Sequence, residues 1–338
     1  MSNASQIPVF DGHNDTLTRE DYGDFVTGRR GGHLDLPRMK VGGMRGGIFA
    51  IFSPTPPGRG GKRVRGAPLD HTLAAADATA AAGRVIVLDR AGAVRLARSI
   101  ADVDAAESGE GPPVAVLHLE GAEAIDPGLE ALDLWHAAGL RSIGPVWSRP
   151  NAFATGIPLA APASPDLGPG LTDAGKALVR RCAELGIVID LSHLNEAGFW
   201  DVAKLDVKPL VASHSAAHAI CPNSRNLTDR QIDAIGATGG LVGIVFGPRF
   251  IRPDAEELVD TPISLIAQHA RYIADRIGAQ HVALGSDFDG TTMPAPLGDV
   301  TGLPALLAEL TTVGFSPEEV AAIAWHNWRR VLDQWWAG

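Results

Sequence analysis

The stretch TDAGKALVRRCAELGIVIDLSH, residues 172–193, decides the predicted fold because a helix, a glycine and a strand follow one another in it. From Thr172 to Leu185 apolar residues recur at helical spacing, and Gly186 is a typical helix stop. The next run, Ile187–Leu191, is mostly apolar, which is typical of a parallel strand that is buried on both faces. A helix that leads into such a strand indicates an α/β fold.

The same order of elements recurs along the 338 residues. Further helices are expected over Thr228–Ile235, Ser264–Ile277 and Leu303–Leu310, and a last helix opens at Ser316 with Pro and Glu in its first turn. Eight apolar runs are expected to form parallel strands: Ile7–Phe10, Gly46–Phe52, Val114–Leu119, Leu140–Val146, Ile187–Leu191, Pro209–Ala212, Gly240–Phe246 and His281–Gly285.

Eight strands that alternate with helices favour a closed (β/α)8 TIM barrel over an open sheet. We find no internal repeat and no linker, so a single domain over residues 1–338 is expected. Two long breaks, Ser53–Pro68 and Asn151–Gly170, are rich in Pro and follow strand ends. They are expected to be long loops at the C-terminal face of the strands.

The composition excludes several classes of protein. A net charge of −10 argues against a nucleic-acid partner, and 45% hydrophobic residues exclude a disordered chain. Cys182 and Cys221 are too few for a disulfide scaffold. No apolar run reaches the roughly 18 residues that cross a bilayer, and Met1–Gln6 lacks the pattern of a secretory signal. We therefore expect a cytoplasmic protein with no membrane partner.

Residue types that bind metal ions follow five of the expected strands. Because active sites of barrel enzymes lie at the C-terminal ends of the strands, these side chains are expected to share one rim. A layer of buried polar groups that satisfy one another is the structural alternative. The six candidates are His13, Asp15, Glu120, His193, His214 and Asp287.

Six such ligands exceed the three or four that one zinc ion takes from a protein. They suit two divalent ions about 3.5–4 Å apart that share a carboxylate, an arrangement that activates water and polarises a carbonyl or phosphoryl oxygen. The residues alone therefore predict a hydrolase with a two-metal site and leave its substrate open.

The sequence resembles the membrane dipeptidase (renal dipeptidase) family, which belongs to the amidohydrolase-like metal-dependent barrels. Within that family it resembles the bacterial members. The resemblance spans nearly the whole chain in family order. It is carried by the segments Asp11-Gly12-His13-Asn14-Asp15, Leu119-Glu120-Gly121, Asp190-Leu191-Ser192-His193, Ser213-His214-Ser215, Ser224-Arg225-Asn226 and Ser286-Asp287-Phe288-Asp289-Gly290.

This resemblance implies two zinc ions per chain, with other divalent ions left open. One ion is expected on His13, Asp15 and Asp287, the other on His193 and His214, with Glu120 as the bridge. The implied reaction is hydrolysis of small dipeptides, including those with a D-residue at the C-terminal position, by a metal-bridging hydroxide. Asp287 is expected to carry the proton to the leaving amine.

Two further residues are expected to contact the substrate. The resemblance assigns the C-terminal carboxylate of the dipeptide to Arg225. Trp147 stands about where the family often has a substrate-contacting His, and a family Tyr near Val245–Pro248 is missing. These departures affect the substrate range and leave open a hydrolase of another small amide, such as an N-acyl amino acid or a lactam.

Several alternatives and secondary assignments accompany this interpretation. The non-enzymatic alternative is a metal-bound scaffold protein, and the oligomeric state is open, a homodimer included. His118 shares a strand face with Glu120 and is expected to be a hydrogen-bonded interior residue. Asp190 and Asp289 are expected to support the site from behind or to shape turns.

Overall fold

The architecture of the chain is α/β, with parallel pairing in every ladder between its strands. The computed structural model describes residues 6–55, 68–207 and 209–337. Each of the eight expected runs contains or overlaps a strand, and a short additional strand, β3, was not predicted. The strands are β1 (Val9–Asn14), β2 (Met44–Ile51), β3 (Arg95–Leu96), β4 (Val114–Glu120), β5 (Leu140–Gly144), β6 (Val188–Ile189), β7 (Val211–Ser215), β8 (Leu241–Ile244) and β9 (Val282–Leu284).

The strands form two sheets that meet through single bridges. One sheet has the order β1-β2-β4-β5-β6, with β3 beside β4, and the other has the order β7-β8-β9. Asp190 bridges to Val211 and Asn14 bridges to Phe288, both in parallel. Apart from β3, the chain order of the strands is therefore also their order in space.

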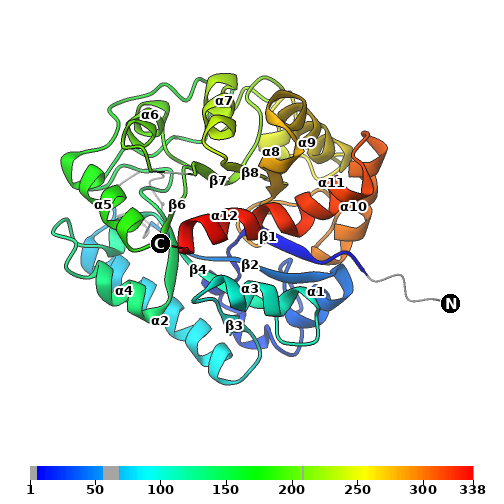
Figure 1. The fold of residues 1–338 in the computed structure, drawn as a ribbon, viewed down its shortest axis with the longest axis horizontal. Helices are drawn as coiled ribbons and strands as arrows, with labels where there is room; N and C mark the ends of the chain where they lie inside the picture. The colour runs from blue at the N-terminus through cyan, green and yellow to red at the C-terminus, as the bar shows by residue number, and fades with distance from the viewer. Residues whose placement is uncertain (1–5, 56–67, 208, 338) are drawn as a thin grey trace, which may run out of the picture.

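Helices surround the strands, as Figure 1 shows. The expected helices are confirmed at α5, α7, α9 and α10, and Ser316 caps α11 in a capping box. The helices are α1 (Leu36–Gly42), α2 (His71–Arg90), α3 (Ile100–Glu107), α4 (Leu132–Ala138), α5 (Asp173–Glu184), α6 (Glu196–Lys204), α7 (Asp229–Ala237), α8 (Pro248–Ile251), α9 (Ser264–Ile277), α10 (Leu303–Thr312), α11 (Pro317–Ala321) and α12 (Asn327–Trp336).

Helix α12 lies across the middle of the group of strands in Figure 1 and packs against β1. Trp328 is fully buried, and its Nε1 donates a hydrogen bond of 2.9 Å to the carbonyl of Leu284. A Cβ on Gly12 of β1 would lie 2.4 Å from the Trp328 ring, so only glycine fits there. Trp325 packs edge-on against Phe10 with ring centroids 5.7 Å apart. These tryptophans belong to the core, as expected.

Strands β1 and β7 continue past the last residue of their apolar runs into polar residues. The predicted ends at Phe10 and Ala212 fall short, because the strands continue to Asn14 and Ser215. The polar residues in β1 find partners inside the fold: Asp11 accepts hydrogen bonds from the backbone N–H and hydroxyl of Ser286 at 2.7 and 2.9 Å. As a result, His13 and His214 lie within strands.

The two expected loops differ in how much of them the structure describes. Residues 151–170 contain no helix or ladder, apart from a bridge between Gly156 and Leu194, and so form a loop as predicted. Most of the Ser53–Pro68 segment lies outside the described residues. Among the helices in the described ranges, none is long and apolar enough to cross a membrane.

Candidate metal centre

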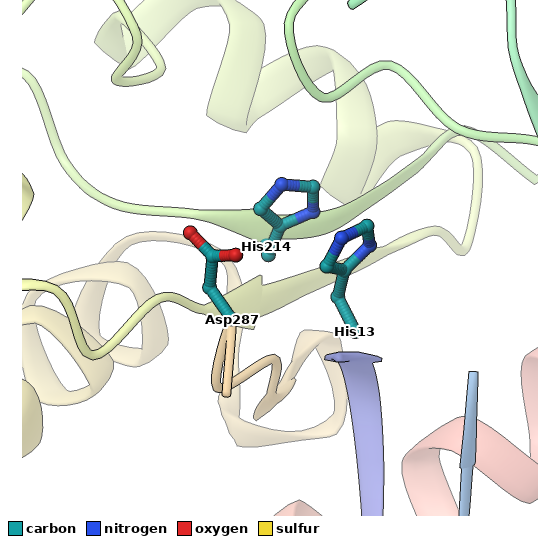
Figure 2. A group of neighbouring side chains, drawn as sticks. All are labelled: His13, His214 and Asp287. Carbon is teal, nitrogen blue, oxygen red and sulfur yellow. The ribbon is translucent and has the colours of Figure 1, made fainter. Parts of the chain in front are cut away.

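The six candidate ligands, which are far apart in the sequence, meet at one end of the strands. His13 and His214 come from β1 and β7, and Glu120 is the last residue of β4. Asp15, His193 and Asp287 lie just beyond β1, β6 and β9. Figure 2 shows His13, His214 and Asp287 pointing toward one another from three separate segments.

The carboxylate of Glu120 lies at the centre of this cluster. Its Oε1 atom is 3.1 Å from Nε2 of His193, 3.4 Å from Nε2 of His214 and 3.5 Å from Nε2 of His13. All four side chains are buried. A carboxylate that three imidazoles face can contact two neighbouring ions at once.

The ligand atoms fall into overlapping groups that could each hold an ion. Glu120 belongs to two of them, one with His13 and Asp15 and one with His193 and His214, with ligand atoms within 4.8 Å of one another. Asp287 groups with His13 and His214, so His13 also belongs to more than one group.

Buried atoms of these residues lack partners within the described part of the protein. Nδ1 and Nε2 of His13 and Oδ1 of Asp15 are buried without a hydrogen bond. An unpaired buried polar atom costs about 1–3 kcal/mol, whereas a bound cation would satisfy such atoms. Nitrogen and carboxylate donors together suit zinc and similar divalent ions. The residues present therefore fit a metal site.

The charges of the cluster also favour a cation. Burial and the neighbouring Asp15 raise the pKa of Asp287 well above the usual value of an aspartate. Burial and Glu120 likewise raise the pKa of Asp15. Although burial opposes it, Glu120 followed by Asp15 raises the pKa of His13 to about 10. These carboxylates repel one another, and a divalent ion between them would remove that repulsion.

Hydroxyl groups orient two of the imidazoles. Nδ1 of His193 shares a hydrogen bond of 2.7 Å with the hydroxyl of Ser148. Nδ1 of His214 shares one of 2.7 Å with Ser213, whose hydroxyl donates to Asp190 at 2.5 Å. In both rings the other nitrogen, Nε2, is left to face Glu120, which is how metal-ligating histidines are commonly held. Asp190 thus supports the site from behind, as expected.

Two of the candidate ligands have a left-handed backbone. The φ angles of His193 and Asp287 are 65° and 61°. This conformation is uncommon for residues other than glycine and is concentrated at functional sites. The turns after β6 and β9 therefore hold these side chains in specific positions.

A cavity of about 980 Å³ opens onto the cluster. Asp15, Glu120, His193 and Asp287 line it, and the indole of Trp147 forms part of its wall. Trp147 packs against Phe52 and His193, with ring centroids 4.8 and 5.9 Å away.

Arg225 is buried, with 5% of its surface exposed, and does not itself line this cavity. Its Nη2 donates a hydrogen bond of 2.6 Å to the backbone carbonyl of His214. The guanidinium therefore supports the strand that carries a candidate ligand, and burial lowers its pKa.

The remaining singled-out residues have structural partners. Nδ1 of His118 lies 2.9 Å from the Ser142 hydroxyl, so His118 is a hydrogen-bonded interior residue, as expected. Its other nitrogen, Nε2, lies 3.8 Å from Asp190. Asp289 accepts hydrogen bonds from Thr16, from Arg29 and from the backbone N–H of His33. Asp289 therefore ties the segment after β1 to the turn that carries Asp287.

Sequence reasoning missed Ser148, His33 and Arg249. Ser148 follows the end of an expected strand, so its position was available as a signal. His33 and Arg249 line the cavity. His33 comes from a segment without a strand or metal-ligand pattern, whereas Arg249 follows the expected strand Gly240–Phe246 but is not a metal-ligand type. Nothing in the sequence alone connects His33 with Asp289, since 256 residues separate them.

The sequence matches the membrane dipeptidase family (peptidase family M19) over residues 3–336. It is 45% identical over 251 residues to an uncharacterized protein in the pqqA 5′ region of Klebsiella pneumoniae, which covers 74% of this chain and 92% of that one.

Two solved structures are similar over 98% of this chain and 99% of theirs, each at 43% identity. One is a metallo peptidase from Rhodobacter sphaeroides liganded with a phosphinate mimic of the dipeptide L-Ala-D-Ala, with a TM-score of 0.92. The other is the dipeptidase AC, a metallo peptidase of family M19, with a TM-score of 0.93.

Proposed function

The chain belongs to the membrane dipeptidase family (peptidase family M19), and from this we propose that it hydrolyses free dipeptides with two zinc ions bound. Dipeptides with a D-residue at the C-terminal position are included among the proposed substrates. The observation that carries the proposal is the position of Glu120, whose Oε1 lies within 3.5 Å of three imidazole nitrogens. The phosphinate mimic of L-Ala-D-Ala on the Rhodobacter sphaeroides relative supports the substrate class.

We infer that the strands form a closed (β/α)8 barrel around this site. The bridges between Asp190 and Val211 and between Asn14 and Phe288 support closure, because they join the two sheets at both of their edges. In such a barrel the ligands would share the C-terminal rim, where barrel enzymes place their active sites.

The proposed ligands divide between the two ions. His13, Asp15 and Asp287 would hold one ion, His193 and His214 the other, and Glu120 would contact both. When bound, the ions would supply an activated water and polarise the carbonyl of the scissile peptide bond.

The protein's own side chains are proposed to complete the reaction. Asp287 would accept a proton and deliver it to the leaving amine, a role that suits a carboxyl whose pKa lies above the usual range. Arg225 would attract the C-terminal carboxylate of the dipeptide. Trp147 and Phe52 would form an apolar wall for one side chain.

The proposal is tested by metal analysis and a substrate panel. We expect two divalent ions per chain, and we expect Glu120→Ala to lose both bound metal and hydrolysis. The panel contains L,L- and L,D-dipeptides, N-acyl amino acids and a lactam. One ion per chain in fully active protein would contradict the two-metal site. Hydrolysis of the acylated compounds alone would favour the other amide hydrolase, and turnover of none would favour a scaffold protein.

A further inference from the structure

The cavity has a charged wall away from the candidate metal ligands, which we call the Arg249 wall. It consists of Arg249 on α8, Glu257 in the following segment, and Thr292 beyond β9, and all three line the same cavity as Asp287. The mechanism proposed above uses none of them.

The guanidinium of Arg249 makes no hydrogen bond in the described part of the protein, and its Cζ lies 5.7 Å from the centroid of the Phe250 ring. Its Nε is buried without a hydrogen bond, and its nearest anionic atom is Oε2 of Glu257, 3.9 Å from Nη1. By contrast Arg19, which also lines the cavity, donates two hydrogen bonds to Asp21 at 2.8 and 3.3 Å. Because Arg249 lines the cavity, its two Nη groups, which make no hydrogen bond to the described residues, are the donors available to a ligand there.

Glu257 has another partner that holds it in place. Its Oε1 accepts a hydrogen bond of 2.7 Å from the hydroxyl of Thr292. The side chain of Glu257 is also about half exposed, so water screens its attraction for Arg249. A ligand carboxylate could thus bind Arg249 without leaving Glu257 unpartnered.

The backbone around Arg249 is fixed from three sides. Asn223 donates to the carbonyl of Arg249 at 3.2 Å, and Asn226 donates to that of Phe250 at 2.8 Å. Nε2 of His269 lies 2.9 Å from the carbonyl of Ile251. Because this backbone is already anchored, binding of a ligand by Arg249 requires ordering of its side chain only.

We propose that Arg249 binds the carboxylate of an acidic side chain, so that the cavity favours dipeptides that contain Asp or Glu. This inference rests on the proposed dipeptide hydrolysis. Guanidinium pairs with carboxylate in a planar, bidentate geometry, which suits an unpaired arginine in a cavity wall. The proposed function gives the C-terminal carboxylate to Arg225, and on that proposal Arg249 is left for a second negative charge.

The experiment compares substrates that differ only in that charge. Ala-Asp is compared with Ala-Asn, and Asp-Ala with Asn-Ala, in both L,L and L,D forms where applicable. For the native protein we expect kcat/KM to favour the acidic substrate of at least one pair by roughly tenfold or more, as charge-assisted hydrogen bonds provide. In Arg249→Met this ratio should fall to near one, mainly through a higher KM for the acidic substrate.

Two further variants separate charge from structure. Arg249→Lys should retain part of the preference, because it keeps the charge but not the bidentate geometry. Arg180→Met, which removes an exposed arginine on α5, should retain all of it. Equal turnover of acidic and amide substrates by the native protein, or a preference that survives in Arg249→Met, would overturn the assignment of Arg249. Turnover of no dipeptide would instead overturn the proposed function.

Discussion

The hydroxyl of Ser148 lies 2.7 Å from Nδ1 of His193, while Nε2 of the same ring lies 3.1 Å from Oε1 of Glu120. One imidazole thus joins the segment after β5 to the last residue of β4. If Nε2 binds a metal ion, Nδ1 carries the proton and donates it to Ser148. The hydroxyl then fixes both the tautomer and the orientation of a proposed ligand.

Removal of this hydroxyl should weaken the metal site. In Ser148→Ala we expect metal affinity or activity to fall by about 10–100-fold, the range seen when such orienting partners are lost. Metal content after dialysis and kcat, measured on one preparation, test this. Ser148→Thr keeps a hydroxyl and should behave much more like the native protein. Native metal affinity and turnover in Ser148→Ala would show that the bond does not orient His193.

Asp287 should contribute to proton transfer. We expect Asp287→Asn to lower kcat by about two orders of magnitude or more, because an amide cannot carry the proton. Since Asp287 is also a proposed ligand, metal content is measured alongside kcat. Near-native turnover with full metal content would remove Asp287 from the mechanism.

Trp147 should restrict the substrate side chains. Its indole fills part of the cavity wall and packs against Phe52, so we expect the native protein to favour small or apolar side chains at that position. Trp147→His should broaden the accepted range at unchanged metal content. Profiles over a dipeptide library, with melting curves alongside, provide the measurement. If Trp147 only supports packing, Trp147→His will lower Tm and leave the profile unchanged.

His269 should make stability depend on pH. It is fully buried, accepts a hydrogen bond from the backbone N–H of Ala217 at 3.0 Å, and burial lowers its pKa to about 4. Between the unfolded pKa of about 6.5 and the folded value, only the unfolded chain binds the proton. The contribution of His269 to stability is therefore fully present above this window and is lost as the pH falls through it. We expect the free energy of unfolding to fall by about 2 kcal/mol between pH 7 and pH 5.

Urea unfolding of the metal-free protein at the two pH values tests this. His269→Gln, which can hydrogen-bond but does not titrate, should show a correspondingly smaller pH dependence. An identical pH dependence in both proteins would mean that His269 does not contribute.

The sequence predicted the order of eight strands and five of the helices, because apolar runs and helix caps are local signals. Helices α1, α2, α3, α4, α6 and α8 were not predicted. The strand ends were predicted less well. An apolar pattern stops at Phe10, but Asp11 stays in the strand because Ser286, far away in the sequence, satisfies its carboxylate. Strand β3 has only two residues, Arg95 and Leu96, which is too short for any pattern.

The candidate ligands were found for a similar reason. Imidazoles and carboxylates that follow apolar strands stand out locally, and the fold brings all six together. Asp190 and Asp289 were expected to support the site, but the partners of Asp289 were not found, because its contact with Arg29 spans 260 residues and has no local signature. The sequence likewise could not show that Arg249 lines the cavity whereas Arg225 is buried and does not.

The contact of Gly12 with Trp328 has a consequence for the order of folding. The strand that carries His13 is completed by a side chain more than 300 residues later, which also bonds to Leu284 just before the turn of Asp287. In a growing chain that lacks α12, the surface of β1 around Gly12 that Trp328 covers is exposed to water. The first strand therefore reaches its final packing only after the last helix has been made. Contacts of such long sequence separation are slow to form. The rim of candidate ligands can therefore assemble only after the chain has been made through α12, and products that end before it should be inactive and prone to aggregate.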